Sequence, residues 1–370
     1  MQLRYRFRLY PTRGQRNALA RAFGCSRVVY NDALRARKDA REAGLPYPRA
    51  AELSAAMTAA KKTPERAWLG EVSAVVLQQS LRDLEAACRA FFDGLAGKRP
   101  RTGAPKFKSG KDARQSIRFT ANARWSITGG GKLALPKIGE VRVRWSRRLP
   151  SVPATVTVVK DAAGRFFASF VVETDDEPLP AADAEAGIDL GLEHFAVLSD
   201  GRKVASPRFL RRAERKLRKA QRDLSRKQKG SANSDKARTK VARSHAQVAD
   251  ARREFHHQLS TTLVRENQAL YVEDLCVKGL ARTRLAKSVH DAGWSAFTAM
   301  LEYKAARYGR TFARVDRAFP SSQICSHCGQ RDGPKPLHVR AWACGGCRVV
   351  HDRDVNAARN ILDEGRRITM

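Results

Sequence analysis

Two closely spaced cysteine pairs constrain this chain more than any other feature. Cys325 and Cys328 form the first C-x2-C pair, and Cys344 and Cys347 form the second after fifteen intervening residues. Four thiolates at this spacing are typical of a structural zinc site, around which a short ribbon folds. The sequence therefore predicts one bound Zn2+ and a zinc ribbon over residues 321–349.

The other three cysteines, Cys25, Cys88 and Cys276, stand singly in apolar surroundings. We expect them to be small buried side chains rather than ligands or nucleophiles, and the seven cysteines do not imply disulfides. The first residues alternate basic and apolar types and lack the continuous apolar segment of a secretory signal. No stretch approaches the ~20 apolar residues that cross a bilayer. These features predict a soluble protein of a reducing compartment with no membrane partner.

The balance of charge indicates a polyanionic partner. The chain has 71 Lys and Arg residues against 37 Asp and Glu, which gives a formal net charge of +34. Such an excess repels itself in a folded protein unless a polyanion neutralises it, and phosphate contacts with counterion release supply that attraction. A basic ribosomal-type protein or a solvated surface is the alternative, but a passive binder has no need of the acidic residues considered below.

The spacing of apolar residues changes twice along the first half of the chain. Residues 3–10 alternate apolar and charged residues, which predicts a half-buried strand closed by Pro11. From Thr12 to Leu95 the apolar residues recur at helical spacing and predict a small all-helical module. After a basic loop, short strands at roughly ten-residue intervals over 116–173 predict a compact antiparallel barrel. The first strand can pair with this barrel, which makes the helical module an insertion.

The second half contains the most basic segment of the chain. Residues 208–254 hold 17 Lys and Arg against five acidic residues. Apolar positions repeat every seven residues on both sides of a break at 230–233: Leu210, Leu217, Leu224, Val241, Val248 and Phe255. This pattern predicts an antiparallel helical hairpin with an apolar seam. Opposite charges for i,i+4 pairs are scarce, so we favour an arm that binds nucleic-acid backbone over a merely solvated coiled coil.

Three acidic residues occupy positions where a carboxylate is unexpected. Asp189 lies in the strand-like GIDLG, Glu273 ends the apolar run ALYVE, and Asp354 opens the helix-like DVNAARNIL. Glu273 and Asp274 point to opposite faces of a strand, so only one of them can share a site with Asp189. Each residue has an ordinary alternative, such as a turn or N-cap for Asp189 and an N-cap for Asp354.

Together the three acids are more specific than they are singly. Carboxylates from two adjacent strands and a helix can hold two Mg2+ ions ~3.5–4 Å apart, an arrangement that activates a water and stabilises the leaving 3′-oxygen. The chain shows no Ser-His-Asp triad signature, and the GGGK segment after Thr128 lacks the spacing of a phosphate-binding loop. The pattern therefore favours metal-dependent phosphodiester hydrolysis.

Five segments, taken in order, carry a family resemblance: GIDLGLEHFAV, VEDL, YKAARYGR, FPSSQICSHCG and HDRDVNAARNI. They resemble the transposon-encoded TnpB (OrfB) family, whose RuvC-like nucleases are related to type V CRISPR effectors. The resemblance runs from RLYPT near the start to the last helix, and the combination is specific although each piece alone is not.

The resemblance implies an RNA-guided DNA endonuclease encoded by a transposon. A guide RNA from the transposon end pairs with one strand of a double-stranded target DNA, and the protein checks a short transposon-adjacent motif. It further implies a monomer with its RNA, in a prokaryotic cytoplasm near the nucleoid.

The fold implied by the resemblance is a multi-domain α+β protein. Its expected parts are a wedge β-barrel (1–11 and 97–180), an inserted helical recognition lobe (12–96), an RNase H-like, RuvC-type α/β nuclease domain (181–320 and 350–370) with the basic hairpin (208–255), and the inserted zinc ribbon.

The resemblance also assigns residues. The family's metal-binding triad, with Mg2+ or Mn2+, falls on Asp189, Glu273 and Asp354, for which Asp274 and Asp352 are the nearest mis-assignments. Zinc falls on the four paired cysteines, and three histidines are expected only as neighbours: His327, His338 and His351. Side chains that read the adjacent motif are expected around Gln78 and Gln79, near Thr120 and at Tyr47. The candidate nucleic-acid contacts on the hairpin are Arg211, Arg215, Arg218 and Arg222.

Two other functions are compatible with the same acids. A DNA strand-transfer transposase would give joined rather than hydrolysed ends, and a nuclease-inactive RNA-guided DNA-binding repressor would be marked by loss of one acid. All three acids are present in this sequence.

Overall fold

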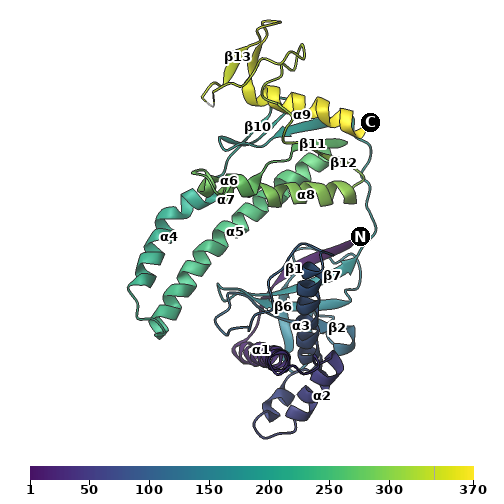
Figure 1. Ribbon diagram of the computed structural model, residues 1–370, viewed down its shortest axis with the longest axis vertical. Coiled ribbons are helices and arrows are strands. Elements are labelled where there is room, and N and C mark those ends of the chain that lie inside the picture. Colours follow the sequence, from purple (N-terminus) through teal and green to yellow (C-terminus); the bar gives the residue numbers. More distant parts are fainter. Residues whose placement is uncertain (337) are drawn as a thin grey trace. The chain divides into compact units, whose positions relative to one another are not determined.

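The computed structural model describes residues 1–336 and 338–370. The chain divides into two compact units, Met1–Thr174 and Asp175–Met370, whose elements are drawn in Figure 1. Within the described residues, no helix combines the length and the apolar character needed to cross a bilayer.

The first unit contains a seven-stranded antiparallel sheet with the order β2-β6-β7-β1-β5-β4-β3. Its strands are β1 (Gln2–Tyr10), β2 (Gln115–Thr120), β3 (Ser126–Ile127), β4 (Lys132–Leu135), β5 (Gly139–Arg144), β6 (Thr155–Lys160) and β7 (Phe166–Glu173). The first strand pairs with β7 from Gln2↔Glu173 to Leu9↔Phe166 and also with β5, as expected from the sequence. All its ladders are antiparallel, as expected for a compact antiparallel barrel, and the hydrogen-bonded order of the described strands runs from β2 at one end to β3 at the other.

The helical segment of this unit consists of α1 (Arg13–Glu42), α2 (Ala50–Ala60) and α3 (Ala74–Leu95), with short 3-10 turns η1 (Ala67–Glu71) and η2 (Ala121–Ala123). A capping box starts α1, because Thr12 Oγ1 accepts from the Gln15 backbone N–H at 3.3 Å and Gln15 Oε1 accepts from the Thr12 N–H at 3.0 Å. Ser80 Oγ donates to the Ser26 carbonyl at 2.6 Å and fastens α3 to α1.

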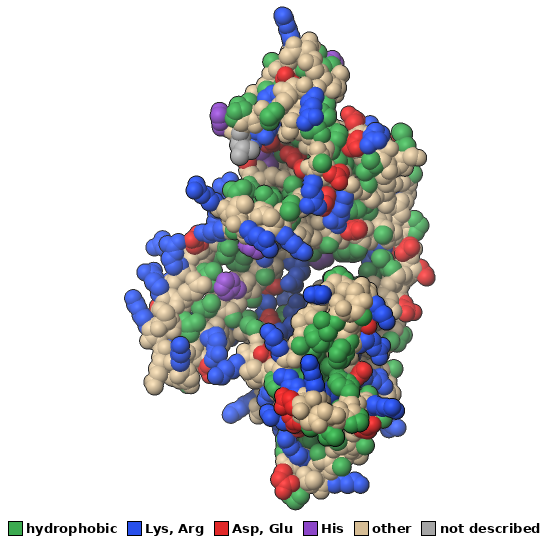
Figure 2. Space-filling model, in the orientation of Figure 1, with side chains coloured by type: hydrophobic (Ala, Val, Ile, Leu, Met, Phe, Trp, Pro, Cys, Tyr) green, Lys and Arg blue, Asp and Glu red, His purple; other side chains and the backbone are tan. Residues whose placement is uncertain are grey.

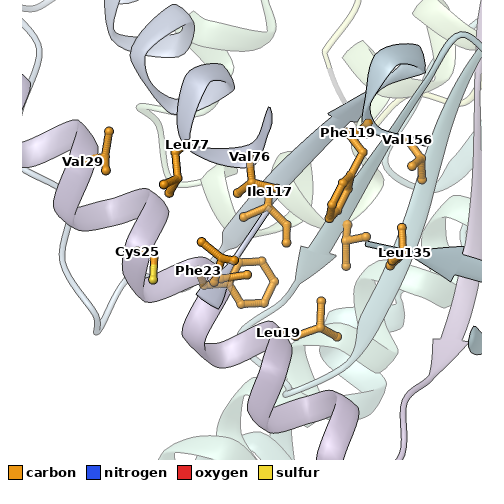
Figure 3. Close-up of a cluster of buried hydrophobic side chains, with 14 of the residues drawn as sticks. Leu19, Phe23, Cys25, Val29, Val76, Leu77, Ile117, Phe119, Leu135 and Val156 are labelled. Atoms are coloured by element: carbon orange, nitrogen blue, oxygen red, sulfur yellow. The ribbon is translucent and has the colours of Figure 1, made fainter. Parts of the chain in front are cut away.

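Helices and sheet of the first unit share one hydrophobic core. Figure 3 shows Leu19 and Phe23 of α1, Leu77 of α3, Phe119 of β2 and Leu135 of β4 in one buried cluster. Burying side chains of this size is the main favourable term in folding. The helical segment and the strands, assigned from the sequence to separate lobes, therefore form one compact unit.

The second unit contains a five-stranded sheet with the order β10-β9-β8-β11-β12. Its strands are β8 (Glu185–Asp189), β9 (His194–Leu198), β10 (Lys203–Ala205), β11 (Ala269–Glu273) and β12 (Thr311–Val315), and a separate pair is formed by β13 (Ala341–Ala343) and β14 (Val350–Asp352). The strands β8, β11 and β12 are mutually parallel, whereas β9 is antiparallel to both of its neighbours, β8 and β10. Because β8 and β11 are parallel neighbours, the residues that end them lie at the same edge of the sheet.

Helices cover both faces of this sheet. The helices of this unit are α4 (Phe209–Ser225), α5 (Ala232–Glu266), α6 (Val277–Leu280), α7 (Ala286–Ala292), α8 (Trp294–Arg307) and α9 (Arg353–Thr369). Leu270 and Val272 of β11 pack in the core with α5 and α8, and Ala269 and Tyr271 pack in the core with Ile361 of α9. Alternate residues of β11 thus serve opposite faces, and Figure 1 shows α9 on the face away from α5 and α8.

Two glycines let α9 approach the sheet closely. A Cβ at Gly187 of β8 would lie 2.1 Å from the Ala358 carbonyl oxygen, and a Cβ at Gly365 of α9 would lie 2.2 Å from Cγ of Tyr271. Real Cβ atoms essentially never make such short contacts, so any side chain at either position would push α9 outward. These two contacts set how closely the middle and the C-terminal part of α9 pack on the sheet.

The predicted helical hairpin is formed by α4 and α5, with the turn at residues 226–231 and with Leu217 and Val248 buried in its seam. Arg208 at the start of α4 provides no side-chain cap. Instead the buried Asp291 of α7 accepts from the backbone N–H groups of Leu210 at 2.8 Å and Arg211 at 3.3 Å. The hairpin is therefore fixed at its base by the α7 segment.

Only two of the three unpaired cysteines are buried, although burial was expected for all three. Cys25 and Cys88 are buried, as expected, but Cys276 is exposed. Cys276 directly precedes α6 and follows the end of β11. Its apolar neighbours in the sequence turn toward the core while its own side chain faces outward, so the prediction of burial is wrong for this residue.

Candidate active site and metal centre

The three acids expected at a metal site line one pocket of about 600 Å3. Asp189 is the last residue of β8, Glu273 is the last residue of β11, and Asp354 lies in the first turn of α9. The N-cap of α9 is Asp352, whose carboxylate accepts from the backbone N–H groups of Asp354 at 3.1 Å and Val355 at 3.0 Å. Asp354 is therefore not the helix cap, and its carboxylate is available to the pocket.

The electrostatics of the pocket show that its negative charges are crowded. Burial, together with the charges of Glu273 and Asp354, raises the pKa of Asp189 to about 7. Burial, and secondarily the charge of Asp274, also raises the pKa of Glu273. Both shifts favour the neutral acid, and a bound cation would reverse them because it stabilises the carboxylates.

The donor set fits a hard divalent cation in kind, because carboxylate oxygens are the ligands that Mg2+ and Mn2+ prefer. Across the described residues, only the four paired cysteines form a group of three or more His, Cys, Asp or Glu side chains whose ligand atoms all lie within 4.8 Å. The three carboxylates thus line one pocket, but their ligand oxygens do not all lie within 4.8 Å of one another. Mutual repulsion keeps like charges apart, and a site for two ions needs its outer ligands separated.

Asp274, the residue after β11, does not line the pocket and pairs with Arg317, so the adjacent acids Glu273 and Asp274 diverge. Sequence reasoning missed two residues that do line the pocket, Glu193 and Arg340. Arg340 lies 2.6 Å from Glu193 and 3.6 Å from a carboxylate oxygen of Asp354. No local signal indicates this contact, because Arg340 comes from the ribbon and the contact depends on the tertiary fold.

The remaining walls of the pocket are basic and apolar. The basic residues are Arg317, Arg331, Arg340 and Arg353, and the apolar ones include Leu275, Leu280, Leu285, Val289 and Trp294. An acidic centre with arginines around it can hold cations and also attract phosphate groups.

The four paired cysteines form the expected metal centre. Their sulfur atoms lie within 4.8 Å of one another, with Cys325 and Cys347 3.6 Å apart and Cys328 and Cys344 3.7 Å apart. Tetrahedral Zn–S bonds of ~2.3 Å separate neighbouring sulfurs by about 3.8 Å. The four sulfurs therefore fit a zinc ion, and a cluster of Cys325, Cys344 and Trp342 supplies the small apolar core around it.

One of the three neighbouring histidines contacts this centre. His351 Nε2 lies 3.0 Å from Cys325 Sγ, and the His351 ring packs on Trp342 with centroids 4.9 Å apart. His327 and His338 are not members of the four-sulfur group. The structure thus brings one of the predicted spectators into hydrogen-bonding distance of a thiolate.

The candidate arginines of the hairpin are exposed along α4, and Figure 2 shows Lys and Arg side chains distributed over this part of the surface. Arg211 donates to Ser288 Oγ at 2.9 Å, and Arg218 pairs with Glu214 at 2.6 Å. Among the described residues, Arg215 and Arg222 have no carboxylate within ion-pair distance. These two are the most available of the four for a phosphate.

The candidate motif-reading residues do not form a single group. Gln78 is exposed near the start of α3, whereas Gln79 is buried. Tyr47 packs against Phe92 near the other end of α3, with ring centroids 6.2 Å apart. Phe92 follows Gln78 by fourteen positions, which corresponds to about 21 Å along the helix. Thr120 ends β2 and bonds to Asn122 at 2.5 Å.

Comparisons with known proteins give three family matches. Residues 169–284 match a family described as "Probable transposase", residues 294–361 match "Cas12f1-like, TNB domain", and residues 1–45 match "Helix-turn-helix domain". In this chain residues 1–45 contain the strand β1 and the single long helix α1 rather than two helices joined by a turn.

Curated relatives match over almost the whole chain. A Streptomyces pristinaespiralis protein named "Putative RNA-guided DNA endonuclease" is 48% identical over 366 residues, which cover 98% of this chain and 89% of the relative. "Putative RNA-guided DNA endonuclease InsQ" of Escherichia coli K12 is 30% identical over 98% of this chain and 92% of its own length.

Among solved structures, the Cas12f1 chain of a complex with sgRNA and target DNA matches 93% of this chain and 81% of its own length, with a TM-score of 0.55 and 13% identity. At this identity the match shows a shared fold.

Proposed function

The chain belongs to the TnpB (OrfB) family, and from that premise we propose that it is a transposon-encoded, RNA-guided DNA endonuclease. Its substrate is double-stranded DNA next to a short transposon-adjacent motif, and its guide is an RNA from the transposon end. The protein acts as a monomer with this RNA. The names of its relatives and the net charge of +34 support nucleic-acid partners.

One observation carries the proposal, namely that carboxylates from β8, β11 and α9 line a single pocket. In the proposed mechanism, Asp189, Glu273 and Asp354 are the ligands for two Mg2+ ions, or Mn2+, in a RuvC-like nuclease unit. Bound divalent ions supply an activated water and stabilise the leaving 3′-oxygen. The side chains of the protein orient the substrate, since the arginines around the pocket can bind the phosphates on either side of the scissile bond.

The zinc ribbon has a structural part in this proposal. A closed set of four thiolates leaves no open coordination position for substrate, so the zinc holds the ribbon together and takes no part in hydrolysis.

We further propose that Gln78 and Thr120 read the adjacent motif. Both residues flank buried positions of the same core, Leu77 and Phe119, which makes their backbone rigid. Tyr47 packs against Phe92, about 21 Å along α3 from Gln78, so it is too distant to read the same bases and is proposed to contact a different part of the nucleic acid.

The experiment that tests the function is purification of the full chain after co-expression with the DNA that flanks its gene, followed by sequencing of the bound RNA. A defined RNA species that matches the flank is expected, and DNA cleavage with Mg2+ should follow the guide when its sequence is changed. Cleavage that needs no RNA would contradict the proposal. Joined strands would indicate a transposase, and guided binding without cleavage would indicate a repressor.

Replacing both Arg215 and Arg222 by glutamine is expected to weaken nucleic-acid binding and reduce its dependence on salt. Each lost phosphate contact lowers the slope of log K against log salt by about 0.9 on duplex DNA and about 0.7 on a single strand. Binding titrations at several salt concentrations measure this slope.

The matched control for this pair is Arg367→Gln, which removes one positive charge from an exposed residue of α9 that pairs with Glu364. Its slope should equal that of the parent protein. An unchanged slope in the Arg215/Arg222 double variant would show that the hairpin has only a structural role.

A further inference from the structure

Two buried asparagines of α9 form hydrogen bonds with backbone groups next to the first cysteine pair of the ribbon. Asn356 accepts from the Ser326 backbone N–H at 2.9 Å and donates to the Ile324 carbonyl at 2.8 Å. Asn360 donates to the carbonyls of Ser321 and Ile324, both at 2.7 Å. The two amides are 1% and 5% exposed, so these hydrogen bonds have no competing water and their loss would leave buried polar groups unsatisfied.

The cysteine between these backbone groups is held by a third side chain. His351 Nε2 lies 3.0 Å from Cys325 Sγ, and both residues are buried. A zinc-bound thiolate is only an acceptor, so the neutral imidazole with its proton on Nε2 is the form that donates to it. His351 directly precedes Asp352, the residue that caps α9.

The same turn of α9 therefore has two sides with different partners. Asp354 and Asn356 are two residues apart, which separates their directions by about 200° around a helix. The Asp354 carboxylate lines the acidic pocket, whereas the Asn356 amide forms hydrogen bonds with the backbone on both sides of Cys325. Any movement of the first cysteine pair must displace either Asn356 or the hydrogen bonds that it makes.

We infer that Asn356, Asn360 and His351 link the zinc centre to the acidic pocket, so that zinc bound to the four cysteines sets the position of the Asp354 carboxylate. Without zinc, four thiols less than 4.8 Å apart have nothing to hold them together, and the partners of both asparagines shift. By linkage, each metal then strengthens the binding of the other by the same factor, and couplings between sites are typically about 5- to 150-fold. This inference rests on the proposed role of Asp354 as a ligand for divalent cations.

The test uses the full-length, zinc-loaded protein and measures transfer of zinc to a chromogenic chelator, with and without saturating Mg2+. In the parent protein, Mg2+ should increase zinc retention by about 5-fold or more. In Asn356→Ala this ratio should fall to about 1. Loss of an outer-shell partner should in addition weaken zinc binding itself by about 10-fold. His351→Gln, which keeps an amide donor near Cys325, should retain more of the ratio than His351→Phe.

Asp363→Ala, an exposed change on the same helix, is the control and should keep the parent ratio. Circular dichroism melting separates loss of coupling from failure to fold, and Asn360→Ala provides a second variant that leaves the Asn356 bonds in place.

If Asn356→Ala and Asn360→Ala both fold and both keep the parent ratio, the inference is overturned while the proposed function stands. If Mg2+ changes zinc retention in the parent and equally in Asp189→Ala, the effect does not come from the acidic pocket and the inference again fails. If the parent binds no Mg2+ in the pocket at all, both the inference and the proposed function are overturned.

Discussion

Replacing Asp189 by alanine is expected to abolish DNA cleavage while guide-dependent DNA binding persists. Asp189 lines the same pocket as Glu273 and Asp354, and burial, together with the charges of these two acids, raises its pKa. Its loss removes a direct ligand of the proposed ions, so the rate should fall beyond the ~100-fold upper end seen for outer-shell partners of metals. Cleavage of a supercoiled plasmid under saturating Mg2+, together with a filter-binding assay, measures the two properties separately.

The control for this substitution is Asp274→Ala. Asp274 follows Glu273 directly but pairs with Arg317 instead of lining the pocket, so cleavage should remain near the parent rate. Full cutting by Asp189→Ala would refute the ligand role of this carboxylate. Loss of both cutting and guided binding would show that Asp189 supports the fold rather than the reaction.

Replacing Cys325 by serine is expected to remove the zinc and unfold the ribbon. Structural Zn2+ contributes about 10–16 kcal/mol to the folding of small zinc modules, and the apolar cluster around this site, Cys325 with Trp342 and Cys344, cannot replace that free energy. Cleavage should also fall, because Asn356 of α9 bonds to the residues on both sides of Cys325. Zinc stoichiometry by mass spectrometry and amide hydrogen exchange over residues 321–356 measure the change.

Cys276→Ser is the matched control, because Cys276 is an exposed free thiol outside the four-sulfur group. It should keep one zinc per chain and the exchange pattern of the parent. A Cys325→Ser protein that retains a full equivalent of zinc and full activity would show that the four-thiolate assignment is wrong.

Features that depend on short-range pattern were predictable from the sequence. The spacing of four cysteines gave the zinc centre, period-two segments gave most strands of the first sheet, and the heptad positions gave the hairpin of α4 and α5. Asp189 and Glu273 stood out because a carboxylate within or at the end of an apolar strand is costly to bury, and both line the acidic pocket. Periodicity is a local property, so it locates elements well.

Features that depend on contacts between distant segments were not predictable in the same way. Nothing local indicates that Arg340 reaches Asp354, that Asp352 rather than Asp354 caps α9, or that Cys276 turns outward. The helical segment and the strands of the first unit were divided by their different periods, yet their apolar faces complete a single core. A hydrophobic pattern indicates that one face of a helix or strand is buried, but it does not indicate which other element packs against that face.

The capping of α4 by Asp291 has a mechanical consequence. Leu285 and Val289, which precede Asp291 in the chain, form part of the pocket wall, while α4 extends about 25 Å from this anchor. The base of the hairpin is therefore hydrogen-bonded to α7, the helix that also supplies Val289 to the pocket wall. A displacement of α4 along its axis would pull on Asp291 and be transmitted to this wall.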